Sequence, residues 1–252
     1  MVLVIGLLAW LALLPKSGEK QQAVCALIVD RTGSSLDPQT RSSYEDRAAS
    51  TIQGCRDINS RMVVFYFDSQ SAKLQPASDS QPFTLFRPET RRESTGEKVV
   101  SSAMAQARES VASVFTHDSG RGRGSDIVTA IDLAAQDLNS LAAKDSVTEK
   151  YIVILTDGYQ TGPEISMKGT FKNEDVPTTE LLDKVEAYSL IPNLDGTRVS
   201  FVGVGGGVTS TKDQVPEWYE AKVAAFWEEL VEAGSGRLCA YRVEASSLPG
   251  QC

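Results

Sequence analysis

Oxygen-bearing side chains alternate at the end of an apolar stretch near the start of the chain, AVCALIVD at 23–30. The sequence continues as RTGS, so that Asp30, Thr32 and Ser34 lie two positions apart. On its own this pattern is explained by a turn in which Asp and Ser accept hydrogen bonds from nearby backbone N–H groups. It indicates a ligand site only when the fold brings further oxygen donors to the same place.

Two such donors occur later in the chain. Ser125 lies in the segment GSDI, and Asp157 directly follows a second apolar stretch, YIVILT at 151–156. Carboxylate and hydroxyl oxygens, without thiolate or imidazole, form a hard donor set that suits Mg²⁺, Mn²⁺ or Ca²⁺ better than zinc. The candidate metal ligands are Asp30, Thr32, Ser34, Ser125 and Asp157.

The composition excludes several classes of function. The chain has 252 residues, of which 41% are hydrophobic and 23% charged, as in ordinary globular proteins. Its net charge of -8 argues against binding to nucleic acid, because a phosphate backbone repels an acidic protein. The single histidine, His117, removes most Ser-His-Asp and Cys-His mechanisms and any zinc site with several histidines.

The apolar stretches alternate with segments of helical periodicity. We expect strands at 23–30, 62–67, 151–156, 199–204 and 238–243, and an edge strand at 82–86. We expect helices at 40–55, 98–116, 126–142, 178–190 and from Pro216 to Gly234. Strands that are apolar on both faces and separated by amphipathic helices predict an α/β fold, a doubly wound and mainly parallel sheet with helices on both faces. In such a sheet ligands bind at the carboxyl ends of the strands, where the strand order reverses.

An apolar leader precedes this domain. Residues 2–15 carry no charge, but they are too few for a bilayer-spanning helix of about twenty residues. We interpret residues 1–21 as an export signal or short membrane anchor with its linker, 22–244 as the domain, and 245–252 as a tail. The protein is then expected outside the cytoplasm, secreted or membrane-anchored. An apolar helix packed on the domain is the alternative interpretation of the leader.

The four cysteines are compatible with an oxidising compartment. Cys25 and Cys55 are placed at the same end of a predicted strand and helix, so they could form one disulfide, and Cys239 and Cys252 could form another. Four buried or free thiols are an equally good interpretation, because cysteine often serves as plain apolar packing.

The combined pattern resembles the von Willebrand factor type A (vWA) domain and its metal ion-dependent adhesion site (MIDAS), which reads D-x-S-x-S, then Thr, then Asp. Here DRTGS at 30–34 has Thr32 in place of the first Ser, GSDI has Ser125 in place of the Thr, and LTDG supplies Asp157. YFDS at 66–69 and FVGVG at 201–205 are also similar to strand ends of that family.

The resemblance covers roughly residues 22–244 and implies a function without a chemical step. It implies that Thr32, Ser34 and Ser125 supply direct or nearly direct ligands, and that Asp30 and Asp157 act mainly through waters and hydrogen bonds. The cation, Mg²⁺ or else Mn²⁺ or Ca²⁺, would be left with an open position for a Glu or Asp of a partner protein. Thr in place of Ser, and Ser in place of Thr, keep the oxygen but alter the methyl groups around it.

Two other functions remain as alternatives. One is a Mg²⁺-dependent hydrolase such as a haloacid dehalogenase-like phosphatase, although its D-x-D-x-T pattern needs an acid where Thr32 stands. The other is a scaffold or assembly subunit in which the ion is structural or vestigial. The glycine-rich segment at 203–207 lacks the G-x-G-x-x-G spacing of a dinucleotide site.

Residues around the proposed ion suggest how a partner is recognised. Arg31, Arg121 and Arg123 could steer an acidic ligand towards the ion, or they could be solvated loop charges. The loop at 158–176 is longer than most connections and is the candidate for partner specificity, with an insertion of no role as the alternative. His117 is expected to cap the end of a helix.

Overall fold

The structure is a computed structural model that describes residues 20–32, 38–67, 75–76, 82–87, 93–116, 124–162, 164–203 and 215–242. Residues 1–19 of the predicted leader and the predicted tail lie outside this part of the chain. Ser34, His117, Arg121 and Arg123 lie outside it as well. None of the described helices is long and apolar enough to cross a membrane.

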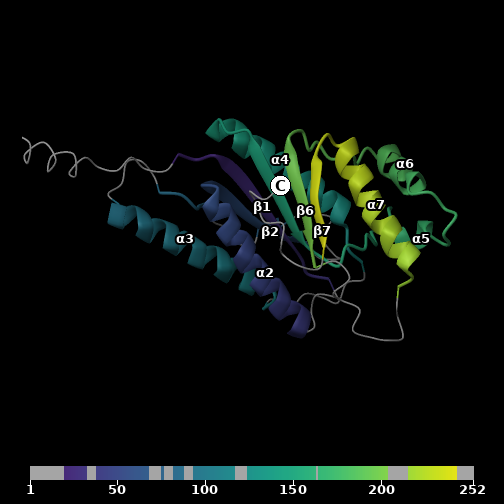
Figure 1. Ribbon diagram of the computed structural model, residues 1–252, viewed down its shortest axis with the longest axis horizontal. Helices are drawn as coiled ribbons and strands as arrows, with labels where there is room; N and C mark the ends of the chain where they lie inside the picture. Colours follow the sequence, from purple (N-terminus) through teal and green to yellow (C-terminus); the bar gives the residue numbers. More distant parts are fainter. Residues whose placement is uncertain are drawn as a thin grey trace, which may run out of the picture.

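A single sheet of seven strands forms the centre of the described structure (Figure 1). The parallel strands are β1 (Ala23–Asp30), β2 (Ser60–Phe67), β5 (Glu149–Leu155), β6 (Thr197–Val202) and β7 (Arg237–Arg242). The strand order is β3-β2-β1-β5-β6-β7, and the short strands β3 (Gln75–Pro76) and β4 (Phe83–Thr84) both pair antiparallel with β2. The predicted α/β fold with a mainly parallel sheet is therefore confirmed.

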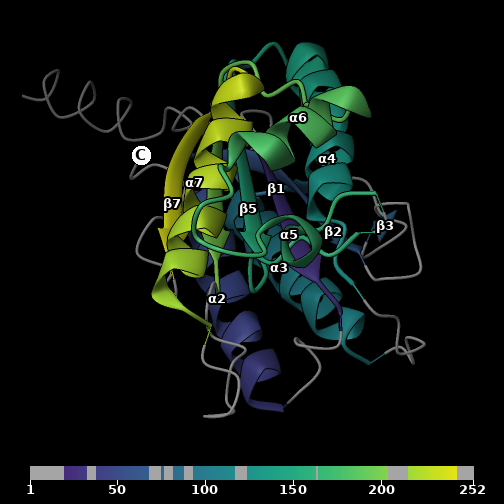
Figure 2. The ribbon, with the colours of Figure 1, turned by 90° about the vertical axis from the view of Figure 1, so that its right-hand side faces the viewer.

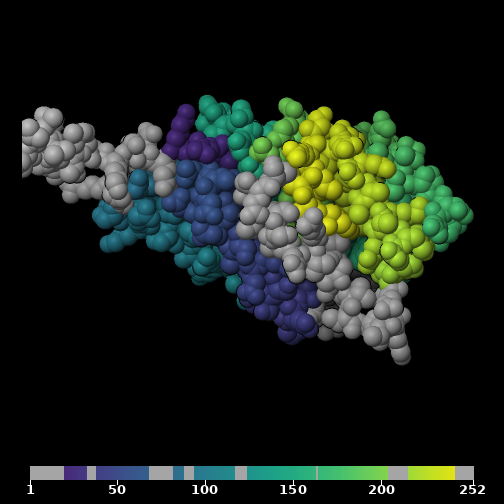
Figure 3. Space-filling view, in the orientation of Figure 1, coloured from purple at the N-terminus to yellow at the C-terminus, as the bar shows by residue number. Residues whose placement is uncertain are grey.

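Helices cover both faces of this sheet. The long ones are α2 (Pro38–Asp57), α3 (Glu93–Val114), α4 (Ile127–Asp145) and α7 (Glu217–Ala233), and the short ones are α5 (Met167–Thr170) and α6 (Thr179–Ala187). In the space-filling view, α2 in blue and α7 in yellow-green form part of the visible surface (Figure 3). Seen from the side, α5 and α6 lie towards the viewer (Figure 2).

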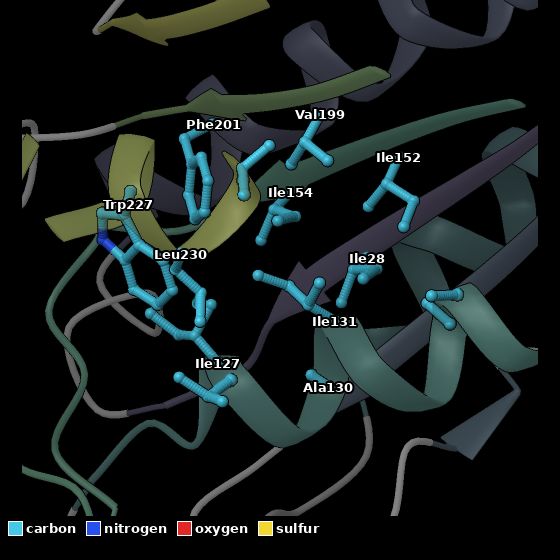
Figure 4. Packing of buried hydrophobic residues seen from close by; sticks show 14 of the residues in the cluster. Ile28, Ile127, Ala130, Ile131, Ile152, Ile154, Val199, Phe201, Trp227 and Leu230 are labelled. Carbon is cyan, nitrogen blue, oxygen red and sulfur yellow. The ribbon is translucent and has the colours of Figure 1, made fainter. Parts of the chain in front are cut away.

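The alternation of side chains along β1 explains why helices are needed on both faces. Val24, Ala26 and Ile28 pack in one apolar core with α4, α6 and α7. The residues between them, such as Cys25 and Leu27, pack in a second core with α2 and α3. Figure 4 shows the first core, in which branched side chains of the sheet meet the apolar faces of α4 and α7. Because β1 is buried on both sides, its sequence is apolar throughout.

The strand order reverses at β1. From β1 the chain crosses to β2 on one side, and after α4 it returns to β5 on the other side. The adjacent carboxyl ends of β1 and β5 therefore form the topological switch point, where open α/β sheets bind ligands. Asp30 is the last residue of β1, and Asp157 lies two residues beyond the end of β5.

The structure differs from the expected elements in four main places. Helix α3 begins at Glu93, five residues before the predicted start at 98, and β3 was not predicted at all. The predicted edge strand at 82–86 is only the two-residue β4. The loop at 158–176 contains the short helix α5. In each case the segment is polar or very short, so it carries no hydrophobic period to reveal it.

Of the two interpretations of Cys25 and Cys55, the structure agrees with free thiols, because both residues are buried and not disulfide-bonded. The two side chains do meet: burial raises the pKa of the Cys55 thiol well above its usual value, and the neighbouring Cys25 thiol adds to this effect. Strand and helix bring the residues together as predicted, but they act as apolar packing. Cys239 is disulfide-bonded, and its predicted partner Cys252 lies outside the described residues.

Candidate metal site at the switch point of the sheet

Asp30 is the centre of the candidate site. It is completely buried, and its Oδ1 atom accepts a hydrogen bond of 2.9 Å from the backbone N–H of Thr32. Its Oδ2 atom accepts one of 2.7 Å from the hydroxyl of Thr156 and one of 3.2 Å from the hydroxyl of Ser125. The carboxylate therefore ties together the end of β1, the end of β5 and the loop before α4.

The hydroxyl groups of Thr32 and Ser125 lie beside each other. Their Oγ1 and Oγ atoms are 3.0 Å apart, and only 5% of Thr32 and 4% of Ser125 is exposed. Ser125 and Thr32 are 93 residues apart in the sequence. Their contact is therefore produced by the fold and not by a local turn. The turn interpretation of the DRTGS pattern does not account for it.

A second carboxylate acts on Asp30. Burial, followed by repulsion from the Asp157 carboxylate, raises the pKa of Asp30 to about 6, while the hydrogen bonds from Thr32 and Thr156 act in the opposite direction. Asp157 is itself half-buried, and its Oδ1 atom accepts a hydrogen bond of 3.1 Å from the backbone N–H of Tyr159. Among the described residues, no cationic side chain is one of the groups that shift the pKa of Asp30. A buried carboxylate with a carboxylate neighbour is stabilised by a positive charge.

Four of the five predicted site residues thus converge at the switch point, and Ser34 lies outside the described residues. The donors are oxygens only, which fits a hard divalent cation. The described part of the chain contains no group of three or more His, Cys, Asp or Glu residues that could hold a metal. A cation here would therefore depend on hydroxyl oxygens as well as on the two carboxylates.

Sequence reasoning missed two residues that support this cluster. Thr156 was noticed at the end of the apolar stretch, but its hydrogen bond to Asp30 was not anticipated. Gln160 is completely buried, and its side-chain oxygen accepts hydrogen bonds from the first backbone N–H groups of α4. Nothing in the local sequence marks Gln160, because a glutamine in a polar loop is usually exposed.

Helix α7 also contacts the loop after β5. The indole Nε1 of Trp227 donates a hydrogen bond of 2.9 Å to the backbone oxygen of Gly158. Near this point the half-buried rings of Tyr159, Trp218 and Tyr219 pack together, with Tyr219 at 6.0 Å from Tyr159 and 5.6 Å from Trp218 between ring centroids. Gly158, which directly follows Asp157, is thereby held by helix α7.

The position of Arg31 disagrees with one of its two interpretations. Only 5% of the residue is exposed, and its guanidinium lies 5.3 Å from the centre of the Tyr66 ring. A buried, ring-stacked arginine is not a solvated loop charge, so that interpretation is wrong, while the steering role stays a prediction.

Comparisons with known proteins give a likeness at the level of the fold. No protein-family model and no curated protein matches the chain. Among solved structures it is similar to the pilus adhesin SpaC from Lactobacillus rhamnosus GG in its open conformation, with a TM-score of 0.51 and 9% identity, over 92% of this chain and 29% of SpaC. The chain therefore spans less than a third of the length of SpaC.

Two further structures are similar at lower scores. The protein BatB from Bacteroides thetaiotaomicron has a TM-score of 0.43 and 15% identity, over 89% of this chain and 92% of its own. The manganese-loaded TRAP protein of Plasmodium vivax has a TM-score of 0.42 and 17% identity, over 86% and 74%. These two likenesses carry no argument at such scores, and the likeness to SpaC, at 9% identity, concerns the fold alone. It agrees with the mainly parallel α/β sheet of the described residues.

Proposed function

We propose that this chain is a protein-binding module, used in adhesion or assembly, in which a divalent cation joins the domain to a carboxylate of a partner protein. The residues that would hold the cation are Asp30, Thr32, Ser34, Ser125 and Asp157. One observation carries the proposal: Asp30 is fully buried among neutral hydrogen-bond donors, and its pKa is raised by burial and by Asp157. Such a carboxylate is unfavourable as an anion until a cation is near.

The residues have separate tasks in this proposal. Thr32 and Ser125 present hydroxyl oxygens side by side, while Asp30 accepts a hydrogen bond from Ser125 and so orients that hydroxyl. Asp157 adds a second negative charge at the rim of the sheet. A bound Mg²⁺, Mn²⁺ or Ca²⁺ would supply an open coordination position for an oxygen of the partner. Mg²⁺ is our first choice because hydroxyls, few carboxylates and waters suit its coordination.

The proposal includes a location and excludes a chemical step. We place the module outside the cytoplasm, secreted or anchored through its apolar N-terminal segment, and SpaC, a pilus adhesin, is a surface protein of similar fold. We propose that it is no enzyme. In the phosphatase alternative an acid is needed at position 32, and the Thr32 hydroxyl is hydrogen-bonded to Ser125 and has no acidic proton to give.

Thermal unfolding tests the cation. With Mg²⁺ or Mn²⁺ in place of a chelator, we expect the Tm of the protein to rise by several degrees, because the cation binds the folded state only. Asp30→Asn keeps the size of the side chain and should abolish the rise. Asp137→Asn on α4, which removes an exposed carboxylate, is the matched control and should keep it. A wild-type Tm that does not change with any divalent cation would overturn the proposal.

The partner is tested in a second step. A pull-down from native cell-surface extract should retain the partner in Mg²⁺ and lose it in chelator or with Asp30→Asn. Replacing the acidic residues of the captured protein one at a time should then identify the carboxylate that reaches the site. If the partner protein is still captured in chelator and by Asp30→Asn, the cation does not bridge the two proteins.

A scaffold with a vestigial site is the second candidate. One observation favours it: Thr32, Ser125, Thr156 and Asp30 already satisfy one another by hydrogen bonds. Under this function the partner is still bound, but through other surfaces of the domain. Partner capture unaffected by chelation is the outcome that would select it.

A further inference from the structure

We propose that Gln160 and Thr161 are positioning residues that fix Ser125 for binding of the cation. The inference rests on the proposed function. It assigns a role to the first part of the loop at 158–176, which sequence analysis assigned to partner specificity. In the structure this part of the loop is hydrogen-bonded to the backbone of Ser125 before α4. The hydroxyl of Ser125 contacts Asp30 and Thr32 instead.

The side chain of Gln160 uses its full hydrogen-bonding capacity. Its Oε1 atom accepts from the backbone N–H groups of Ile127 at 2.7 Å and Val128 at 3.1 Å. Its Nε2 atom donates to Asp126 Oδ1 and to the backbone oxygen of Ile165, both at 3.1 Å. An amide can accept two hydrogen bonds and donate two, so no alternative orientation satisfies all four groups. The first turn of α4 is therefore held at a fixed place relative to the loop.

Thr161 binds the backbone of Ser125 on both sides. The Ser125 N–H donates to Thr161 Oγ1 at 2.6 Å, and the Thr161 N–H donates to the Ser125 backbone oxygen at 2.9 Å. Ser125 is thus held at both its backbone N–H and its backbone oxygen, and its hydroxyl is left for Asp30 and Thr32. The segment before it fits closely too, because a Cβ atom on Gly124 would lie 2.6 Å from the Thr161 backbone oxygen.

The arrangement links the two halves of the candidate site. Asp157 lies only three residues before Gln160 and four before Thr161, so the loop that provides one carboxylate also holds the hydroxyl of Ser125. The separation of these two ligands is then set by a short piece of chain before any cation arrives. Groups that orient metal ligands commonly change metal affinity by about 10-fold to 100-fold when they are removed.

The test compares two substitutions at Thr161. Thr161→Val removes the oxygen that accepts from Ser125 but keeps the shape, while Thr161→Ser keeps the oxygen. Thr161 is exposed, so neither change removes a core contact. Thr178→Val is the control, because it removes a hydroxyl with a 2.6 Å hydrogen bond to Glu229, away from Ser125.

Two measurements give the answer. In chelator, we expect the Ser125 amide to exchange with solvent about ten-fold faster in Thr161→Val, with no change in Thr161→Ser or Thr178→Val. In calorimetric titration with Mg²⁺ or Mn²⁺, we expect Thr161→Val to bind roughly ten-fold more weakly than the wild type. Thr161→Ser should restore the affinity, and Gln160→Met should weaken it further if that variant folds.

Three results would overturn the inference. The first is an unchanged cation affinity in Thr161→Val. The second is an equal loss of cation affinity in Thr178→Val, which would mean that removing a hydrogen bond from any loop weakens binding. The third is a normal exchange rate of the Ser125 amide in Thr161→Val. If the wild-type protein binds no cation, the proposed function itself is wrong. The exchange measurement in chelator would still show whether Thr161 holds the Ser125 backbone.

Discussion

Two carboxylates near opposite ends of the parallel strands have opposite surroundings. Asp145, the last residue of α4, receives two hydrogen bonds from Arg61 Nη1, at 2.9 Å and 3.0 Å, and one of 3.0 Å from Gln21. Asp30, at the end of β1 and near the start of α4, is contacted by one backbone N–H and two hydroxyls. Asp145 is paired with a positive charge within the protein, and Asp30 has neutral donors and a repelling carboxylate.

Under the proposed function, this difference separates an end of the sheet that serves structure from an end that binds a cation. An ion pair such as Arg61 with Asp145 is complete in the folded chain and needs nothing further. A buried carboxylate without a cationic side chain costs stability, and such a cost is tolerated chiefly at functional sites. We therefore expect perturbations of the two ends to differ in sign and in their dependence on a divalent cation.

The largest effect is expected from Arg61→Met. This substitution leaves the Asp145 carboxylate, of which 13% is exposed, without its arginine. Breaking a largely buried pair in this way costs about 2 to 3 kcal/mol, somewhat less than for a fully buried one because water still reaches it. Urea unfolding should show the same loss in chelator and in Mg²⁺. A loss that depends on the cation would mean that the two ends are coupled, against the separation drawn above.

The opposite sign is expected from Asp30→Asn in chelator at pH 7.5. The amide resembles the protonated acid and can still meet Thr32, Ser125 and Thr156, while the buried negative charge disappears. A rise of the pKa from 3.8 to about 6 corresponds to at most ~3 kcal/mol, so the variant should be about 1 to 2 kcal/mol more stable than the wild type. Excess Mg²⁺ should reverse this order. A variant that is less stable in both conditions would show that Asp30 is a structural residue.

The same shift predicts how stability depends on pH in chelator. The folded state holds the proton of Asp30 more tightly than the unfolded state does, since its pKa is raised to about 6 from 3.8. The contribution of this group is therefore complete below the unfolded pKa and is lost as the pH rises through about 6. Relative to Asp30→Asn, the wild type should lose stability between about pH 4 and 6 and change little above that. Parallel pH profiles of the two proteins would contradict the raised pKa.

Much of the fold could be predicted because its central strands are buried on both faces. β1 reads as an unbroken apolar segment, and the helices around it carry an apolar side chain at every third or fourth position, which the sequence displays directly. β3 and α5 have no such signal. β3 is held by pairing with β2, and α5 by hydrogen bonds at its own ends, such as that from the Gly169 N–H to the Ser166 side chain. Neither contact leaves a hydrophobic period in the sequence.

The candidate site was predicted in part for a related reason. Asp30 and Asp157 follow apolar strands, so the position of their strands in the sheet was enough to bring them together. Gln160 gave no signal, because its role depends on the first turn of α4, about thirty residues earlier in the chain. Residues that hold a ligand in place act through backbone groups, which every sequence possesses, and so they are found only in the structure.

The smallest effect concerns two glycines that have positive φ at opposite ends of the molecule. Gly196, before β6, has φ +63°, and an added Cβ would meet nothing within 4 Å. Gly196→Ala should cost only the strain of the left-handed conformation, about 1 kcal/mol, and should leave the Tm rise with Mg²⁺ unchanged. Gly124 has φ +122°, and its Cβ would meet the Thr161 backbone oxygen, which cannot move without disturbing Ser125. Gly124→Ala should therefore cost more than Gly196→Ala and should also reduce the Tm rise. If both variants kept the full Tm rise with Mg²⁺, the close packing around Ser125 would contribute to folding but not to cation binding.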